Sequence, residues 1–329
     1  MEYITEKQLF LLLCLGLSLA GGCVKQKSSG ELPQKQGIIL GFSQIGAESA
    51  WRTCHTRSVK EAAAQAGVQL LFSNAEQKQE NQIRAIRSFI AYQVDVIAFV
   101  PIVSGGWDNV LMEARDAGIP VLVTDRKIDS DEGLYAGFIG TDSIAEGRNA
   151  GLFLLEKFKE PLERGGPIRI VELSGTVGSS AATGRAEGFR EVLAPYPQFQ
   201  IVHSASGDFL RSKGYELMQS ILASYSNIDV IFSHNDGMTL GVLDAVKEAS
   251  LKPGTDMAIV TVDAEQAVIN ALIRGEVNCV IECNPKQGPG IIRLAQTLAR
   301  GESISRLIHV DETVFYEWDD LSALPPRGY

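Results

Sequence analysis

The stretch VLVTD at residues 121–125 is a short apolar run that ends in an aspartate, and IVTVD at residues 259–263 repeats this pattern. In the same way, VDVI at 94–97 is echoed by DVIF at 229–232. Val and Ile at consecutive positions are typical of strands buried on both faces, as in parallel sheets. The repetition therefore predicts two similar domains built on such strands.

Working outward, similar apolar runs alternate with helical segments from residue 37 onward. A helix predicted over 48–66 stops at Gly67, and Ile83, Ile86 and Ile90 recur at the spacing of one helix face. This alternation predicts an α/β fold with two similar doubly wound parallel-sheet lobes. The expected strands are 37–42, 68–72, 94–100, 121–124, 135–139, 168–173, 200–204, 229–233, 258–262 and 277–283.

Length and charge agree with this organisation and narrow the function. A chain of 329 residues exceeds the usual size of one compact core and favours two domains. Its formal net charge is -10, and an acidic chain repels phosphate backbones. We therefore expect no nucleic-acid partner.

The N-terminus is typical of an exported protein. The apolar run at residues 9–19 is too short to span a membrane, and it ends in Ala20-Gly21-Gly22-Cys23. Small residues before a cysteine predict a lipoprotein-like signal peptide over residues 1–23, with Cys23 as the lipidated residue. A plain secretory signal cut nearby is the alternative. The polar residues 24–36 are predicted to form a tether.

The remaining cysteines, Cys54, Cys279 and Cys283, do not have the spacing of a disulfide framework or a metal site. Cys279 and Cys283 would lie about 13 Å apart along one strand, whereas a disulfide needs Cα atoms within about 7 Å. We expect all three to be small buried apolar side chains. The histidines show no ligand spacing either, so neither a metal nor a cofactor is expected.

Candidate binding residues follow the predicted strands, because ligands in open α/β sheets bind beyond the carboxyl ends of the strands. An aromatic face can cover the C–H groups of a sugar, while carboxylates accept hydrogen bonds from its hydroxyls and guanidinium groups donate to them. Each candidate residue could instead have a structural role. Either aspartate could cap the N-terminus of a helix, and the tryptophan could pack in the core. The asparagine could form a turn, and an arginine could be a solvated helix residue. The candidates are Trp51, Arg52, Asp125, Arg126, Arg185 (expected to open the helix after a 174–183 loop), Asn235 and Asp263.

Longer stretches carry a specific resemblance. Together they resemble periplasmic sugar-binding proteins of the ribose/galactose class, which feed ABC importers, and most closely the galactofuranose-binding members of that class. The resemblance extends over about residues 37–329. The stretches are GFSQIGAESAWR (41–52), QKQENQIRAIRSFIA (77–91), DRKID (125–129), ELSGTVGSSAATGR (172–185), SGDFLRSKG (206–214) and HNDGM (234–238).

The resemblance implies two lobes joined by a three-strand hinge, with the ligand in the cleft between them. The first lobe would contain 37–140 and about 284–312, and the second 141–283 and about 313–329. Ala50 and Gly237 depart from the family pattern, in which Gly and Asp are expected. The implied ligand-binding residues are Glu48, Ser49, Trp51, Arg52, Asp125, Arg126, Arg185, Asn235 and Asp263, with Phe209 as a further candidate.

The implied function is capture of a monosaccharide, galactofuranose or a related furanose or pentose, and its delivery to the membrane subunits of an ABC importer. Such a protein would be a monomer in the periplasm or at the outer face of the cell membrane, touching the membrane only through an N-terminal lipid. It would not be an enzyme, and the G-x-S-x-G, P-loop and G-x-G-x-x-G motifs are absent from the sequence. The alternatives are a sugar-sensing subunit that presents its ligand to a membrane receptor, and a LacI-type repressor core, which would need a DNA-binding domain before the first strand.

Overall fold

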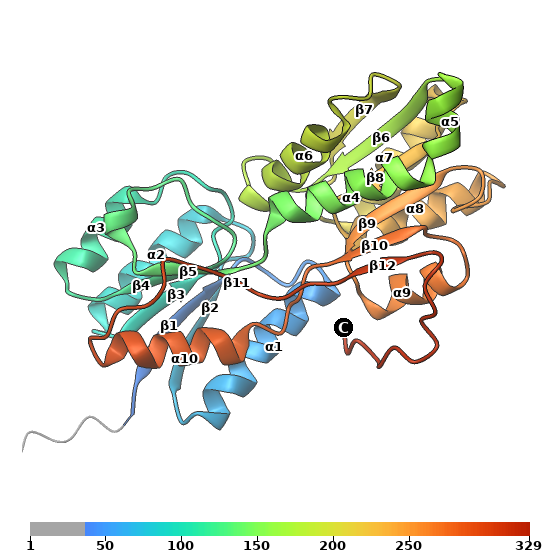
Figure 1. Ribbon diagram of the computed structural model, residues 1–329. Helices are drawn as coiled ribbons and strands as arrows, with labels where there is room; N and C mark the ends of the chain where they lie inside the picture. Colours follow the sequence, from blue (N-terminus) through green and yellow to red (C-terminus); the bar gives the residue numbers. More distant parts are fainter. Residues whose placement is uncertain (1–36) are drawn as a thin grey trace, which may run out of the picture. The chain divides into compact units, whose positions relative to one another are not determined.

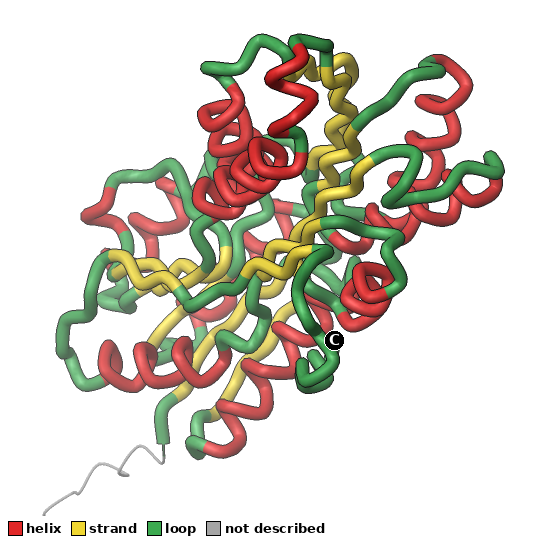
Figure 2. The backbone as a smooth tube through the Cα atoms, turned by 45° about the vertical axis from the view of Figure 1, so that its right-hand side comes forward, coloured by secondary structure: helices red, strands yellow, loops and turns green. Residues whose placement is uncertain are grey.

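The computed structural model describes residues 37–329, so the predicted signal peptide (1–23), the lipidation site Cys23 and the tether (24–36) lie outside the described residues. The described part contains two six-stranded sheets flanked by helices (Figure 2). All ten predicted strands are present, each with its ends within two residues of the prediction. The predicted fold class of two doubly wound lobes is confirmed.

The first lobe is built on a wholly parallel sheet with the order β11-β5-β4-β3-β1-β2. Helices α1 and α10 cover one face, and α2 and α3 cover the other (Figure 1). Alternate residues of the strands pack against the two helix pairs, which explains why the strands are apolar at consecutive positions. The elements are β1 (Ile39–Gln44), α1 (Ala50–Gln65), β2 (Gln69–Asn74), α2 (Gln79–Ala91), β3 (Val96–Phe99), α3 (Asp108–Asp116), β4 (Val121–Asp125), the 3-10 helix η1 (Glu132–Leu134), β5 (Gly137–Gly140), α10 (Gly288–Ala299) and β11 (Leu307–His309).

The second lobe repeats this plan with the order β12-β10-β9-β8-β6-β7, in which only β12 is antiparallel to its neighbour. Helices α4 and α6 pack on one face of the sheet, and α7, α8 and α9 on the other. The elements are α4 (Ser143–Lys157), α5 (Lys159–Arg164), β6 (Ile168–Ser174), α6 (Ser180–Leu193), β7 (Phe199–Ser206), α7 (Arg211–Ser224), β8 (Val230–Ser233), α8 (Asp236–Glu248), β9 (Ala258–Asp263), α9 (Gln266–Ile273), β10 (Cys279–Glu282) and β12 (Val314–Tyr316).

Three chain segments connect the lobes. They are residues 141–142 between β5 and α4, residues 283–287 between β10 and α10, and residues 310–313 between β11 and β12. The strands β11 and β12 on either side of the third segment were not predicted. Each has only three residues and lies at a sheet edge, so it carries little periodic signal.

The cysteine prediction is confirmed for the described residues, where Cys54, Cys279 and Cys283 are free and buried. Within residues 37–329, every helix is too short or too polar to cross a bilayer.

Candidate functional site

The predicted binding residues converge on one small cavity between the lobes, in which the space open to the centre of a water-sized sphere is about 30 Å³. Ala181 and Cys283 complete the lining and were not predicted. The lining contains every predicted residue: Glu48, Ser49, Trp51, Arg52, Asp125 and Arg126 from the first lobe, and Arg185, Phe209, Asn235 and Asp263 from the second.

A buried ion-pair group forms the floor of the first-lobe side. Arg52 donates from Nε to Glu48 Oε1 at 2.9 Å and from Nη1 to Asp125 Oδ2 at 2.7 Å. Asp125 ends β4 with a left-handed φ of 64°, a strained conformation that concentrates at functional sites. No helix begins there, so the N-cap alternative for this aspartate is wrong. Ser49 does cap a helix, because its side chain accepts from the backbone N–H of Arg52.

Trp51 links the first lobe to the second lobe and to the segment between β10 and α10. Its backbone N–H donates to Glu265 Oε1 at 3.0 Å, and its indole N–H donates to the backbone carbonyl of Cys283. The indole also stacks on His55, with ring centroids 5.3 Å apart. The packing alternative is therefore correct for Trp51, and the same side chain also lines the cavity.

On the second-lobe side, Arg185 is held from three directions. Its Nε donates to Glu146 Oε2 at 2.6 Å, its Nη1 donates to the backbone carbonyl of His234, and its Nη2 lies 3.9 Å from Asp263 Oδ1. Asn235 caps α8 by accepting from the Met238 N–H. Because all of these groups are buried beside the cavity, they offer preorganised donors and acceptors to a polar ligand.

The comparison with known proteins decides the family. A family model described as "Periplasmic binding protein domain" matches residues 40–303. The chain belongs to the periplasmic binding protein family.

Three relatives illustrate what this periplasmic binding protein is similar to. The galactofuranose-binding protein YtfQ of Escherichia coli (strain K12) is 40% identical over 84% of this chain and 87% of its own length. A crystal structure from Mycobacterium smegmatis in complex with β-D-fucofuranose is 46% identical, with a TM-score of 0.85 over 88% of this chain and 95% of that chain. The periplasmic component of the arabinose ABC transporter from Shewanella sp. ANA-3, bound to α- and β-L-arabinofuranose, is 42% identical, with a TM-score of 0.81 over 85% and 92% of the two chains. The Escherichia coli relative is named as a binding protein and the Shewanella relative as a component of an ABC transporter.

The charged groups of the cavity in this periplasmic binding protein differ in protonation. Burial opposes ionisation of Asp125, but the neighbouring cationic groups, Arg52 foremost and Arg126 with it, together outweigh burial and lower the pKa of that carboxyl. Burial, with the guanidinium of Arg52 nearby, lowers the pKa of Arg126 to about 10, so this side chain remains a cation at neutral pH. Burial raises the pKa of Asp263 well above its usual range, even though Arg185 lies beside it. The cavity thus presents an anionic acceptor, three guanidinium donors and a carboxyl that favours its neutral form.

Arg126 differs from the other buried arginines because no carboxylate lies within ion-pair distance of it among residues 37–329. Its Nη1 donates to the Ile102 carbonyl at 3.1 Å, and the guanidinium lies 5.0 Å from the centroid of the Phe209 ring. A guanidinium has five N–H groups, so several remain for a ligand.

One local prediction is wrong. Arg185 was expected to open a helix, but α6 begins at Ser180, so Arg185 is its sixth residue. The loop ends earlier because Ser179 caps the helix by accepting from the Ala182 N–H. The sequence signal was available, as a serine stands before an alanine-containing stretch.

The position of Arg185 depends on a close approach of α4 and α6. A Cβ added to Gly147 would lie 2.1 Å from the Arg185 carbonyl oxygen, and one added to Gly188 would lie 2.0 Å from the Ile144 carbonyl oxygen. Only glycine permits this contact, which brings Glu146 of α4 within reach of Arg185. Glu146 was not predicted, because it does not follow a strand and nothing local marks its role.

Proposed function

We propose that this periplasmic binding protein captures a monosaccharide in its furanose form, galactofuranose or a related sugar, and delivers it to an ABC importer. The observation that carries the proposal is that the ten predicted side chains line a single buried cavity. Their chemistry fits a small polyhydroxylated ring. The names of the relatives, which specify galactofuranose, fucofuranose and arabinofuranose, support a furanose rather than another polar ligand.

In the proposed complex, the guanidinium groups of Arg126 and Arg185 donate to sugar oxygens and the Asp125 carboxylate accepts from sugar hydroxyls. The Trp51 and Phe209 rings supply the apolar surface for C–H groups. Each hydrogen bond to a charged group is worth about 1.5–3 kcal/mol. Several such bonds give roughly micromolar affinity once the costs of association are subtracted.

The mechanism follows from the position of the cavity between two lobes. Hydrogen bonds join the two lobes directly: the Ser104 N–H donates to the Gly178 carbonyl at 2.8 Å, and the Lys127 N–H donates to Ser180 Oγ at 2.7 Å. A sugar that contacts both lobes at once stabilises this closed arrangement over an open one. The closed form is the one that we expect to dock on the importer.

We further propose that the mature protein works as a monomer in the periplasm or at the outer face of the cell membrane, with a lipid on Cys23. The sequence before residue 37 and the periplasmic family support export. Mass spectrometry of the protein from membranes tests the anchor, because a diacylglyceryl group on Cys23 disappears in Cys23→Ser.

Calorimetric titration of residues 37–329 with galactose, arabinose, ribose and fructose tests the ligand. We expect galactose to bind, and the anomeric carbon shift of bound ¹³C-galactose to report the furanose ring. Recovery of unchanged sugar is expected after prolonged incubation. Failure of all four sugars to bind would refute the proposal, and a bound pyranose would refute its ring form.

A further inference from the structure

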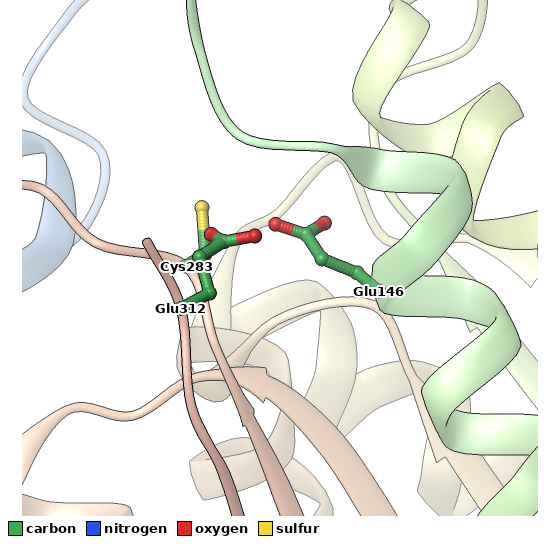
Figure 3. A group of neighbouring side chains, drawn as sticks. All are labelled: Glu146, Cys283 and Glu312. Atoms are coloured by element: carbon green, nitrogen blue, oxygen red, sulfur yellow. The ribbon is translucent and has the colours of Figure 1, made fainter. Parts of the chain in front are cut away.

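Three side chains, two from the segments that join the lobes and one from the helix that follows the first segment, meet beside the binding cavity. Glu146 lies in the first turn of α4 just after the first segment, Cys283 begins the second segment, and Glu312 lies in the third. Their ligand-type atoms lie within 4.8 Å of one another, and Figure 3 shows the two carboxyl groups facing each other beside the thiol.

The two carboxyl groups face each other, and each has an oxygen without a hydrogen-bond partner. Glu146, which is 1% exposed, uses Oε2 to accept from Arg185, whereas its Oε1 has no hydrogen-bond partner. Oε1 of Glu312 is likewise shielded from solvent and without a partner. Two buried carboxylates this close cannot both be ionised, but a carboxyl and a carboxylate can share one proton in a hydrogen bond.

The surrounding charges also favour a retained proton. Among residues 37–329, Arg185 on α6 is the one guanidinium that pairs with Glu146. It also lies beside Asp263 at the end of β9, whose carboxyl is close to those of Asp236 and Glu265. One cation cannot balance all of these carboxyl groups. Burial, and then the negative charge of Glu146, raise the pKa of Glu312 against the effect of Arg185. Burial also raises the pKa of the Cys283 thiol, so it stays neutral.

We propose that Glu146 and Glu312 share one proton across the hinge of the closed protein, and that this proton-linked pair positions Arg185 for the sugar. The two residues are positioning residues, since neither lines the cavity itself. The inference rests on the proposed function for its sugar-binding half, whereas the shared proton can be tested without a sugar.

The sign of the pH effect follows from linkage. A carboxyl whose pKa is raised in the closed form keeps its proton there, while the same group in an open or unfolded form loses it above about pH 4.3. As pH rises from that value, the closed form is progressively disfavoured and sugar affinity falls. Where the closed form holds one proton more than the open form, the fall reaches about tenfold per pH unit.

The test compares galactose affinity from pH 5.5 to 9.5 in the wild type, Glu312→Gln and Glu146→Gln. Glutamine at 312 supplies a permanent N–H donor to Glu146, so its pH slope should disappear. Glu146→Gln removes the anion that orients Arg185 and should weaken binding at every pH. Glu302→Gln, on the surface beside Arg300, is the matched control and should keep the wild-type slope. Titration in buffers of different ionisation enthalpy should show proton uptake on binding in the wild type and none in Glu312→Gln.

The same variants separate failure of this inference from failure of the proposed function. If galactose does not bind at all, the sugar assignment fails, and the shared proton is judged from thermal unfolding without sugar. The melting temperature of the wild type should then fall relative to that of Glu312→Gln as pH rises from 5 to 9. A constant difference between the two, or equal pH slopes for galactose binding, would overturn the inference. Stabilisation by added Zn²⁺ or Ca²⁺ that is lost in Glu312→Gln would replace it with a metal site.

Discussion

Arg126→Met should separate ligand binding from stability more cleanly than any other change in the cavity. Arg126 is buried with no carboxylate partner among the described residues, and it lies near Arg52 and Arg185. Its pKa falls to about 10 on folding, which corresponds to about 3 kcal/mol of unfavourable free energy at neutral pH. Methionine removes this penalty and retains most of the side-chain volume.

Two smaller losses oppose that gain. The variant gives up the hydrogen bond to the Ile102 carbonyl and the contact with the Phe209 ring. Together these are worth about 2–4 kcal/mol, if a charged hydrogen bond contributes about 1.5–3 kcal/mol and a cation–π contact about 0.5–1 kcal/mol. The gain and the losses nearly cancel, so the free energy of unfolding should change by no more than about 1 kcal/mol. Sugar binding, in contrast, loses at least one charged hydrogen bond, and the affinity should fall by about 10- to 150-fold.

The assay pairs urea unfolding of the sugar-free protein with calorimetric titration of galactose. Arg293→Met, at an exposed position of α10, controls for the loss of a positive charge and should leave both measurements unchanged. Galactose binding at wild-type affinity would show that Arg126 does not face the ligand. Destabilisation by several kcal/mol would show that the arginine is a structural cation after all.

Three further outcomes are expected. Gly175→Ala should weaken galactose binding while the protein stays folded, because the added Cβ would lie 1.8 Å from Cζ of Phe209 and must displace that ring. Gly166→Ala is the control, since nothing lies within 4 Å of a Cβ added there. Equal galactose affinities of the two variants would contradict the role of Phe209. In a protein of residues 37–329, the three free cysteines should resist Ellman's reagent in the native state and react after unfolding, since all are buried. Rapid labelling of the native protein would contradict this. Because Arg52 lowers the pKa of Asp125, this carboxylate contributes stability above about pH 3.9, and that stability is lost as pH falls through the lower native pKa. Asp125→Asn should therefore reduce the loss of unfolding free energy at acid pH, as measured by urea unfolding. An unchanged acid dependence would refute the pairing with Arg52.

Much of the fold could be predicted from strand periodicity, and part of the cavity lining from the residues that follow the strands, whereas Glu48, Ser49 and Phe209 came from the family resemblance. Parallel strands buried on both faces are apolar throughout, and the topology gathers their carboxyl ends at one edge, where Asp125 and Asp263 lie. Cys283 directly follows β10 (Cys279–Glu282), but the predicted strand 277–283 ended on it, so the same rule did not include it.

The supporting groups could not be found in this way. Glu146 lies within a helix, and Glu312 lies between two three-residue edge strands. Their importance comes from contacts with segments far away in the sequence. Only the packing of α4 against α6, set by glycines on both helices, shows that Glu146 reaches Arg185.

The two N–H groups of Trp51 bear on how the importer would recognise a loaded molecule. Both donate to acceptors outside the first lobe, one of them on Glu265 and the other on the Cys283 carbonyl. These hydrogen bonds form between parts of the protein itself, so the closed protein contains them whichever ligand occupies the cleft. Different sugars should therefore produce one common outer surface, and a transporter reading only that surface could accept several cargoes without contacting any of them.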